Sequence, residues 1–141
     1  MLSERQVELL EALVNRIIPA DEFAGGWEGG VRDYLLRQFE RDLKALLPIY
    51  RLGLDALDGE ARAVYGRNFD SLAPELQDEL LRQIEAGRIT TPWTVDPLAF
   101  FRMVIEHSAE GYYSDPGNGG NPDTASWAMA SWTMIGFQVR G

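Results

Sequence analysis

The chain has 141 residues, a formal charge of −9 at pH 7 and no cysteine. Its length suits one domain, which would bury about two thirds of the surface that the unfolded chain exposes, so we expect residues 1–141 to form a single domain. The negative charge, without a basic stripe, argues against binding to nucleic acid or anionic lipid. The lack of cysteine excludes disulfides, thiolate metal sites and cysteine nucleophiles. No apolar run reaches the about 18 residues of a membrane span, so we expect no direct membrane insertion.

The first helix is predicted by its capping signal. Ser3 is a good N-cap residue, and Gln6 stands three residues later, as in a capping box. Apolar residues then recur at helical spacing until Pro19 ends the pattern; they are Val7, Leu10, Val14 and Ile17. Residues 21–30 contain four glycines, and we expect a loop there that Trp27 pins to the body of the protein.

Two further helices are predicted between Val31 and Gly66. Apolar residues at three- and four-residue steps indicate one helix from Val31 to about Leu47; they are Tyr34, Leu35, Phe39, Leu43, Leu46 and Leu47. Pro48 suits the first turn of the next helix and Gly66 its end. The apolar stripe predicted for that helix contains Ile49, Leu52, Ala56, Leu57, Ala61, Val64 and Tyr65.

Two more helices follow a short connector at residues 68–72. One begins at Pro74 and is closed by Gly87, with a predicted apolar face of Leu76, Leu80, Leu81 and Ile84. Residues 89–95 indicate a short extended link. Asp96 and Pro97 are a favourable N-cap and N1 pair for a helix ending near Gly111, and we expect Trp93, Phe100 and Phe101 to be core residues.

No segment alternates apolar and polar residues as a half-buried strand would. The fold is therefore predicted to be all-α, a compact single-domain bundle of about five helices. An aromatic C-terminal loop segment rich in Gly, Asn and Pro follows the last of them. Its aromatic residues are expected to be covered either by the core or by a partner, because Tyr and Trp are enriched at the centres of interfaces. Both alternatives stay open for Tyr112, Tyr113, Trp132 and Phe137.

Three blocks of the sequence carry a family resemblance. They are Arg16–Glu22, Tyr50–Leu57, and Glu110–Pro116 followed by Gly119–Asn121 and Trp132–Phe137. With these blocks in this order, the chain resembles the small third subunit of the gluconate 2-dehydrogenase family from roughly Leu9 to Phe137. Trp127 is a second candidate for the final tryptophan of the family, because Thr124–Ser131 is longer than the usual spacing.

The resemblance implies a non-catalytic small (gamma) subunit without a cofactor of its own. Its partner in a hetero-oligomer would be an FAD-dependent dehydrogenase of the glucose-methanol-choline type, acting on a sugar, glycoside or sugar acid, which it helps to fold and export. Whether a cytochrome c subunit completes the assembly stays open. The implied partner-contact residues are Tyr112, Tyr113, Asp115, Gly119, Gly120, Asn121, Trp132, Met134 and Phe137.

Many members of this family begin with a twin-arginine export signal, whereas no Arg-Arg pair precedes Leu2. A periplasmic location is expected if a signal was trimmed or if the partner carries one. A cytoplasmic location is expected otherwise.

The sequence contains few candidate catalytic residues, and we expect no catalytic residue and no metal ligand. His107 is the only histidine, with Glu106 and Glu110 close by. A carboxylate-bridged metal pair takes ligands from several helices and two histidines. We therefore expect His107 to be a capped or partner-facing residue near the end of its helix, where the dipole favours its charged form.

Two loops carry other polar candidates. Asp115, Asn118, Asn121 and Asp123 could suggest calcium, but their spacing is not that of an EF-hand. Bonds of Asp115 and Asn121 to their own backbone in Asx turns are favoured instead. Gly117, Gly119 and Gly120 lack the lysine of a phosphate-binding loop. Asp21, beside Glu22, is expected to cap a turn rather than contact substrate. The alternative function is a stand-alone helical binding or stress module that shares only the fold.

Overall fold

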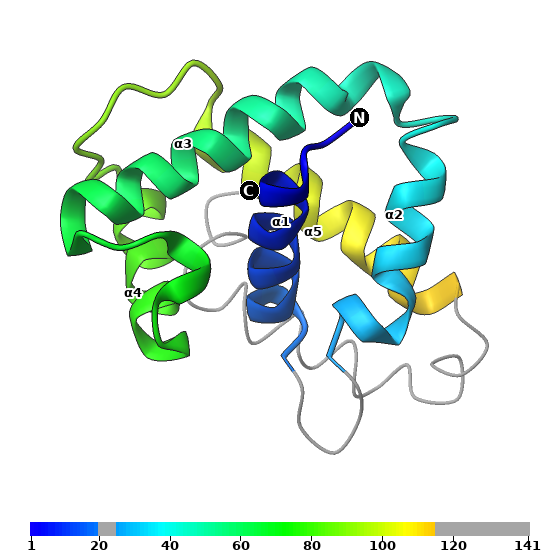
Figure 1. Ribbon diagram of the computed structural model, residues 1–141, viewed down its shortest axis with the longest axis horizontal. Helices are drawn as coiled ribbons and strands as arrows, with labels where there is room; N and C mark the ends of the chain where they lie inside the picture. Colours follow the sequence, from blue (N-terminus) through cyan, green and yellow to red (C-terminus); the bar gives the residue numbers. More distant parts are fainter. Residues whose placement is uncertain (20–24, 115–141) are drawn as a thin grey trace.

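Helix α1 (Glu4–Ile17) lies at the centre of the protein in the computed structural model, which describes residues 1–19 and 25–114 (Figure 1). The other helices surround it, with α3 across one end and α2 and α4 on opposite sides (Figure 1). Within the described residues all regular structure is helical, which confirms the all-α prediction. The remaining elements are η1 (Trp27–Val31), α2 (Arg32–Gln38), η2 (Lys44–Leu46), α3 (Leu47–Tyr65), η3 (Phe69–Ser71), α4 (Pro74–Glu85) and α5 (Pro97–Ser114).

The start of α1 has the predicted capping box. The amide of Gln6 donates to the hydroxyl of Ser3 at 3.1 Å, and the amide of Ser3 donates to the side-chain oxygen of Gln6 at 3.0 Å. These two bonds satisfy amides that have no partner within the helix. The inward face of α1 is buried as its periodicity predicts, and its buried residues are Leu9, Leu10, Leu13, Val14 and Ile17.

The second predicted helix is wrong in its length. Helix α2 ends at Gln38, and the chain turns through residues 39–43 and the short η2 before α3 begins. This turn brings Phe39 edge-on against Tyr50, with ring centroids 4.8 Å apart. A helix continued to Leu47 would carry the two rings apart, so aromatic packing overrides the helical periodicity. The predicted loop before α2 also contains η1, whose helical course is interrupted at Gly29 and Gly30, and Trp27 in it is buried as expected.

Helix α3 buries only part of the predicted stripe, namely Leu57 and Ala61. Its inward residues are Tyr50, Leu54, Leu57 and Ala61, whereas Leu52 and Val64 of the predicted stripe are each 45% exposed. Both faces of α3 are apolar at helical spacing, and periodicity alone cannot choose between them. Gly53 decides the choice, because it lets the ring of Phe100 from α5 lie directly against the α3 backbone. The predicted end at Gly66 is confirmed, with φ at +71°.

The connector, α4 and the start of α5 follow the sequence signals. Pro74 begins α4 and Gly87 follows its end with φ at +85°, but Leu76 is 41% exposed rather than buried. Helix α5 continues past the predicted end at Gly111 to Ser114. Gly111 is a packing residue here, since a Cβ atom at this position would lie 3.0 Å from the side chain of Tyr34 in α2.

The core expectations for the aromatic residues of this region are confirmed in part. Phe100 and Phe101 are buried. Trp93 is half-buried and packs edge-on against Phe101, with ring centroids 6.0 Å apart. The core therefore extends from α1 through α3 and α5 to the link before α5.

Two glycines of α3 provide a matched test of this packing. Gly53→Ala is expected to cost about 1–3 kcal/mol, because the new methyl group would overlap the Phe100 ring. Gly59→Ala is expected to stabilise the protein by about 0.5–1 kcal/mol, because nothing lies within 4 Å of the new Cβ atom and alanine favours a helix interior. Urea unfolding of both variants measures the difference. Equal free energies of unfolding would show that α3 and α5 are not in close contact at Gly53.

Candidate functional site

Of the predicted partner-contact residues, one is buried, one is exposed, and the others lie outside the described residues. Tyr112 is buried, 2% exposed, which places it in the core of this chain rather than on a free surface. Tyr113 is 38% exposed and meets Tyr112 edge-on, with ring centroids 6.3 Å apart. The other predicted contacts lie outside the described residues; they are Asp115, Gly119, Gly120, Asn121, Trp132, Met134 and Phe137.

The remaining loop candidates also lie outside the described residues. These are the carboxylates Asp21 and Glu22, the oxygen-bearing side chains Asn118 and Asp123, and the glycine Gly117. Among residues 1–19 and 25–114, no three side chains of Asp, Glu or His gather closely enough to hold a metal ion.

The single histidine is engaged with a buried tyrosine. The hydroxyl of Tyr50 lies 2.7 Å from Nδ1 of His107, and the two rings are stacked with centroids 5.9 Å apart. Burial raises the pKa of Tyr50, so this hydroxyl keeps its proton. It donates to Nδ1 when the imidazole is neutral and carries its proton on Nε2.

The predicted charge of His107 is wrong in direction. Helix α5 continues to Ser114, so His107 lies about two turns before its end, beyond the reach of the terminal dipole. Burial lowers the pKa of His107, although Glu110 and Glu106 act in the opposite direction. The neutral ring therefore links α3 to α5 and is not poised as a charged group at a helix end.

The most constrained polar group in the described structure is the carboxylate of Glu60, which is fully buried on α3. Its Oε2 accepts from the amide and hydroxyl of Thr90 at 2.7 and 2.8 Å. Its Oε1 accepts from the amide and hydroxyl of Thr91 at 3.1 and 2.5 Å, and from the indole nitrogen of Trp93 at 3.4 Å. A buried charge is tolerated only with such partners, so Glu60 holds the link between α4 and α5 against α3.

Sequence reasoning missed this residue. The one available signal is the position of Glu60 among the apolar residues Leu57, Ala61 and Val64 of α3. Burial raises the pKa of Glu60, but the hydrogen bonds from Thr91 and Thr90 outweigh burial, and the net direction is downward. The carboxylate is therefore ionised at neutral pH.

Two arginines of α1 connect it to neighbouring elements. Arg5 contacts Asp70 of η3, with one of its bonds at 2.8 Å, and lies 3.5 Å from Asp58 of α3. Asp58 is buried and also accepts from the amide of Phe69 at 2.9 Å. The bond to Arg5 lowers the pKa of Asp70. Arg16 forms the second connection, to Asp78 of α4 at 2.9 Å.

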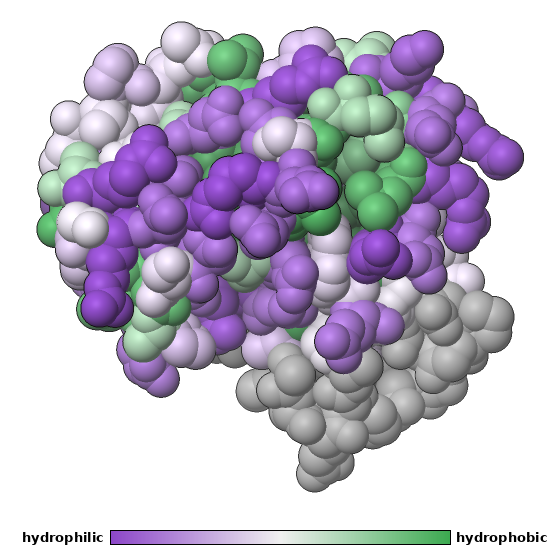
Figure 2. Space-filling view, viewed as in Figure 1, coloured by the Kyte–Doolittle hydropathy of each residue, from purple (hydrophilic) through white to green (hydrophobic). Residues whose placement is uncertain are grey.

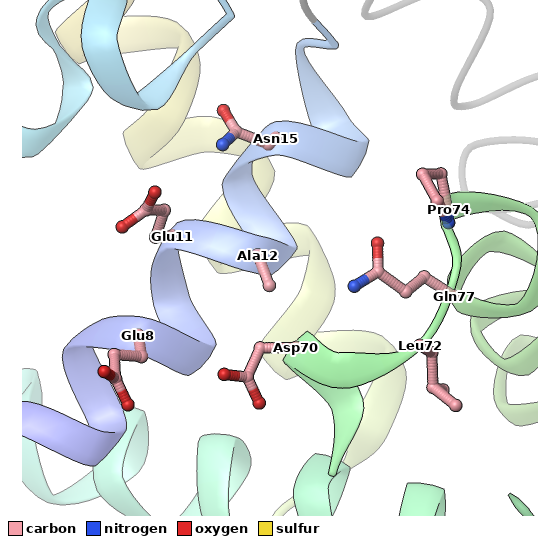
Figure 3. A pocket seen from close by; sticks show the side chains of 8 residues that line it. All are labelled: Glu8, Glu11, Ala12, Asn15, Asp70, Leu72, Pro74 and Gln77. Atoms are coloured by element: carbon pink, nitrogen blue, oxygen red, sulfur yellow. The ribbon is translucent and has the colours of Figure 1, made fainter. Parts of the chain in front are cut away.

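A polar cleft of about 410 Å³ lies between α1 and the η3–α4 segment (Figure 3). Glu8, Glu11 and Asn15 line it from α1, and Asp70 and Gln77 point toward them from the other side (Figure 3). Most of these polar groups already have structural partners, which are Arg5 for Asp70 and Glu8, Phe69 for Gln77 and Trp27 for Asn15. The cleft is thus lined by groups that hold helices together.

Comparison with known proteins identifies one family. The model of the family described as gluconate 2-dehydrogenase subunit 3 matches residues 4–138, a range that includes every described helix. Neither the curated proteins nor the solved structures include one with significant similarity to this chain. In the part of the chain that the structure describes, no helix is both long and apolar enough to cross a membrane.

The role of Glu60 can be tested with Glu60→Gln. We expect a loss of about 2 kcal/mol in the free energy of unfolding, because the amide group would face donors that need an acceptor. Glu75→Gln, an exposed change on α4, serves as the matched control and should cost a few tenths of a kcal/mol at most. Urea unfolding at pH 7 measures both. Equal effects of the two substitutions would contradict the buried carboxylate.

The effect of Glu60→Gln on stability is also expected to depend on pH. The pKa of Glu60 is lower in the folded than in the unfolded state, so its stabilisation is present at neutral pH and is lost as pH falls through the folded-state pKa. The difference in unfolding free energy between the wild type and Glu60→Gln should therefore shrink below about pH 4. A difference that grows with acidification would show that the pKa is raised instead.

Proposed function

The chain belongs to the gluconate 2-dehydrogenase subunit 3 family, and from this premise we propose that it is the non-catalytic small subunit of an FAD-dependent dehydrogenase complex. The observation that carries the proposal is the family match from residue 4 to residue 138, nearly the whole chain. The partner we propose is a catalytic subunit of the glucose-methanol-choline type that acts on a sugar, glycoside or sugar acid.

The described polar groups support a role in binding rather than catalysis. His107 is bonded to Tyr50, Glu60 to the link before α5, and Arg5 to Asp70. Each of these groups joins two elements of this chain. A general acid or base would need to reach a substrate proton within hydrogen-bond distance, whereas these groups are already occupied within the fold.

We propose that the chain stabilises the folded catalytic subunit by mass action. A subunit that binds only the folded form of its partner stabilises that form in proportion to its concentration and affinity. This would assist folding, and export of the complex where a partner carries the signal. We also propose FAD as the cofactor of the partner subunit, with none bound by this chain.

The proposed contact includes the C-terminal segment that α5 leads into. Tyr113 is exposed on the last described turn of α5, and the segment beyond it carries Trp132, Met134 and Phe137. Large aromatic residues bury much area with few torsions to fix, as an interface anchor requires.

Purification with and without the catalytic subunit tests the proposal. The chain alone is expected to show no flavin absorption and no dehydrogenase activity, and the co-expressed pair is expected to co-purify with flavin bound to the larger subunit. Visible absorption spectra and dye-linked oxidation of sugars and sugar acids provide the measurement. A yellow isolated chain with activity would contradict the proposal, and so would failure of the two subunits to associate.

The anchor role of Trp132 has a matched control in Tyr112. Trp132→Ala is expected to weaken binding by about 2 kcal/mol or more while the melting temperature of the isolated chain stays nearly unchanged. Tyr112→Ala removes a buried aromatic and is expected to cost about 3–5 kcal/mol of folding stability, with unchanged affinity per folded molecule. Calorimetry and binding titration separate the two effects. A lower melting temperature and normal affinity for Trp132→Ala would make it a core residue.

A further inference from the structure

One flank of the outward side of α3 is apolar along most of its length. Uncharged residues recur there at alternating steps of three and four; they are Ile49, Leu52, Ala56, Gly59 and Ala63. Leu52 and Val64 are each 45% exposed, and Ala63 is exposed as well. An exposed helix of a monomer is expected to be polar on its outward side, so this flank of α3 has the composition of a face that another surface covers.

The link between α4 and α5 extends this apolar face. Ala56, Ala63 and Val64 stand three or four residues from Glu60 and are its neighbours on the helix surface. Thr90 and Thr91 bond to the Glu60 carboxylate, which places the link beside these residues. The link carries a further exposed apolar side chain, Ile89, at 39% exposure.

We define the α3–link surface by its exposed or half-buried apolar residues, which are Leu52, Ala56, Ala63, Val64, Ile89 and Pro92. The area of Figure 2 over the link is pale or green, in contrast to the purple centre of the same view (Figure 2). No charged residue occurs in the sequence from Ile89 to Val95, although charged residues make up 25% of the chain.

Charged side chains border the surface on the side that faces α1. They are Arg51, Asp55 and Arg62. Arg51 bonds to the carbonyl of Met1, Asp55 to Gln6 of α1 and Arg62 to Asp58 of α3. An uncharged centre with a charged edge is the pattern of a protein interface. The carboxylate of Glu60 also fixes the link in place before binding, which lowers the entropy that association would cost.

We propose that the α3–link surface docks an uncharged apolar surface of the catalytic subunit. This inference rests on the function proposed above and names a contact for it that is separate from the C-terminal segment. The charge of the chain selects the occupant. A second copy would bring another −9 against the first and would be repelled, and the family to which the chain belongs is that of one subunit of a dehydrogenase complex.

The test places one charge in the middle of the surface. Leu52→Glu and Ala63→Glu change exposed residues on opposite halves of α3, so both variants are expected to fold with wild-type circular dichroism. Leu76→Glu adds the same charge at a similarly exposed apolar position on α4, outside the α3–link surface. Each full-length variant is titrated against the purified catalytic subunit at matched ionic strength.

We expect the dissociation constant to rise about tenfold or more for Leu52→Glu and Ala63→Glu, because docking would bury an unpaired charge, and to stay within about twofold for Leu76→Glu. Equal affinities of all three variants and the wild type would overturn the α3–link surface while the proposed function stands. Absence of binding by the wild type would overturn both. Sedimentation of the chain alone is expected to show a monomer, and a dimer broken by Ala63→Glu would assign the surface to a second copy instead.

Discussion

The fold depends most on how one buried negative charge is satisfied. Glu60 lies inside the protein with no exposed surface, and its stabilisation requires the two amides and two hydroxyls of Thr90 and Thr91. These partners belong to the link between α4 and α5, so the link cannot leave α3 without exposing or stranding the carboxylate. The position of the link in turn determines where α5 begins, and α5 supplies the Phe100 ring that packs on Gly53.

Polar side chains also connect other elements of the described structure. Arg5 and Arg16 tie α1 to η3 and α4, and the pair of Tyr50 and His107 ties α3 to α5. Partly exposed ion pairs contribute little free energy individually. Their effect is mainly geometric, since they select one arrangement among the several that an apolar helical core would accept.

A fold held by such contacts would suit the binding role proposed above. A surface that keeps its shape in the free state binds a partner more tightly than one that must become ordered, because ordering a surface on binding subtracts from affinity. The binding role proposed above would use two different kinds of surface. One would involve the exposed Tyr113 and the aromatic residues Trp132 and Phe137 of the C-terminal sequence, and the other is the apolar flank of α3 with its attached link. A subunit with both could hold its partner at two points and fix its orientation as well as its presence.

The sequence by itself determined the helical class, the capping box at Ser3, the start of α4 at Pro74 and the end of α3 at Gly66, because these features depend on residues within a few positions of one another. It also carried the family resemblance. The tertiary structure alone decided the end of α2, the buried face of α3, the packing role of Gly111 and the partners of Glu60 and His107. The reason is distance along the chain: Glu60 meets residues 30 positions away and Tyr50 meets a residue 57 positions away, and local periodicity contains no information about such contacts.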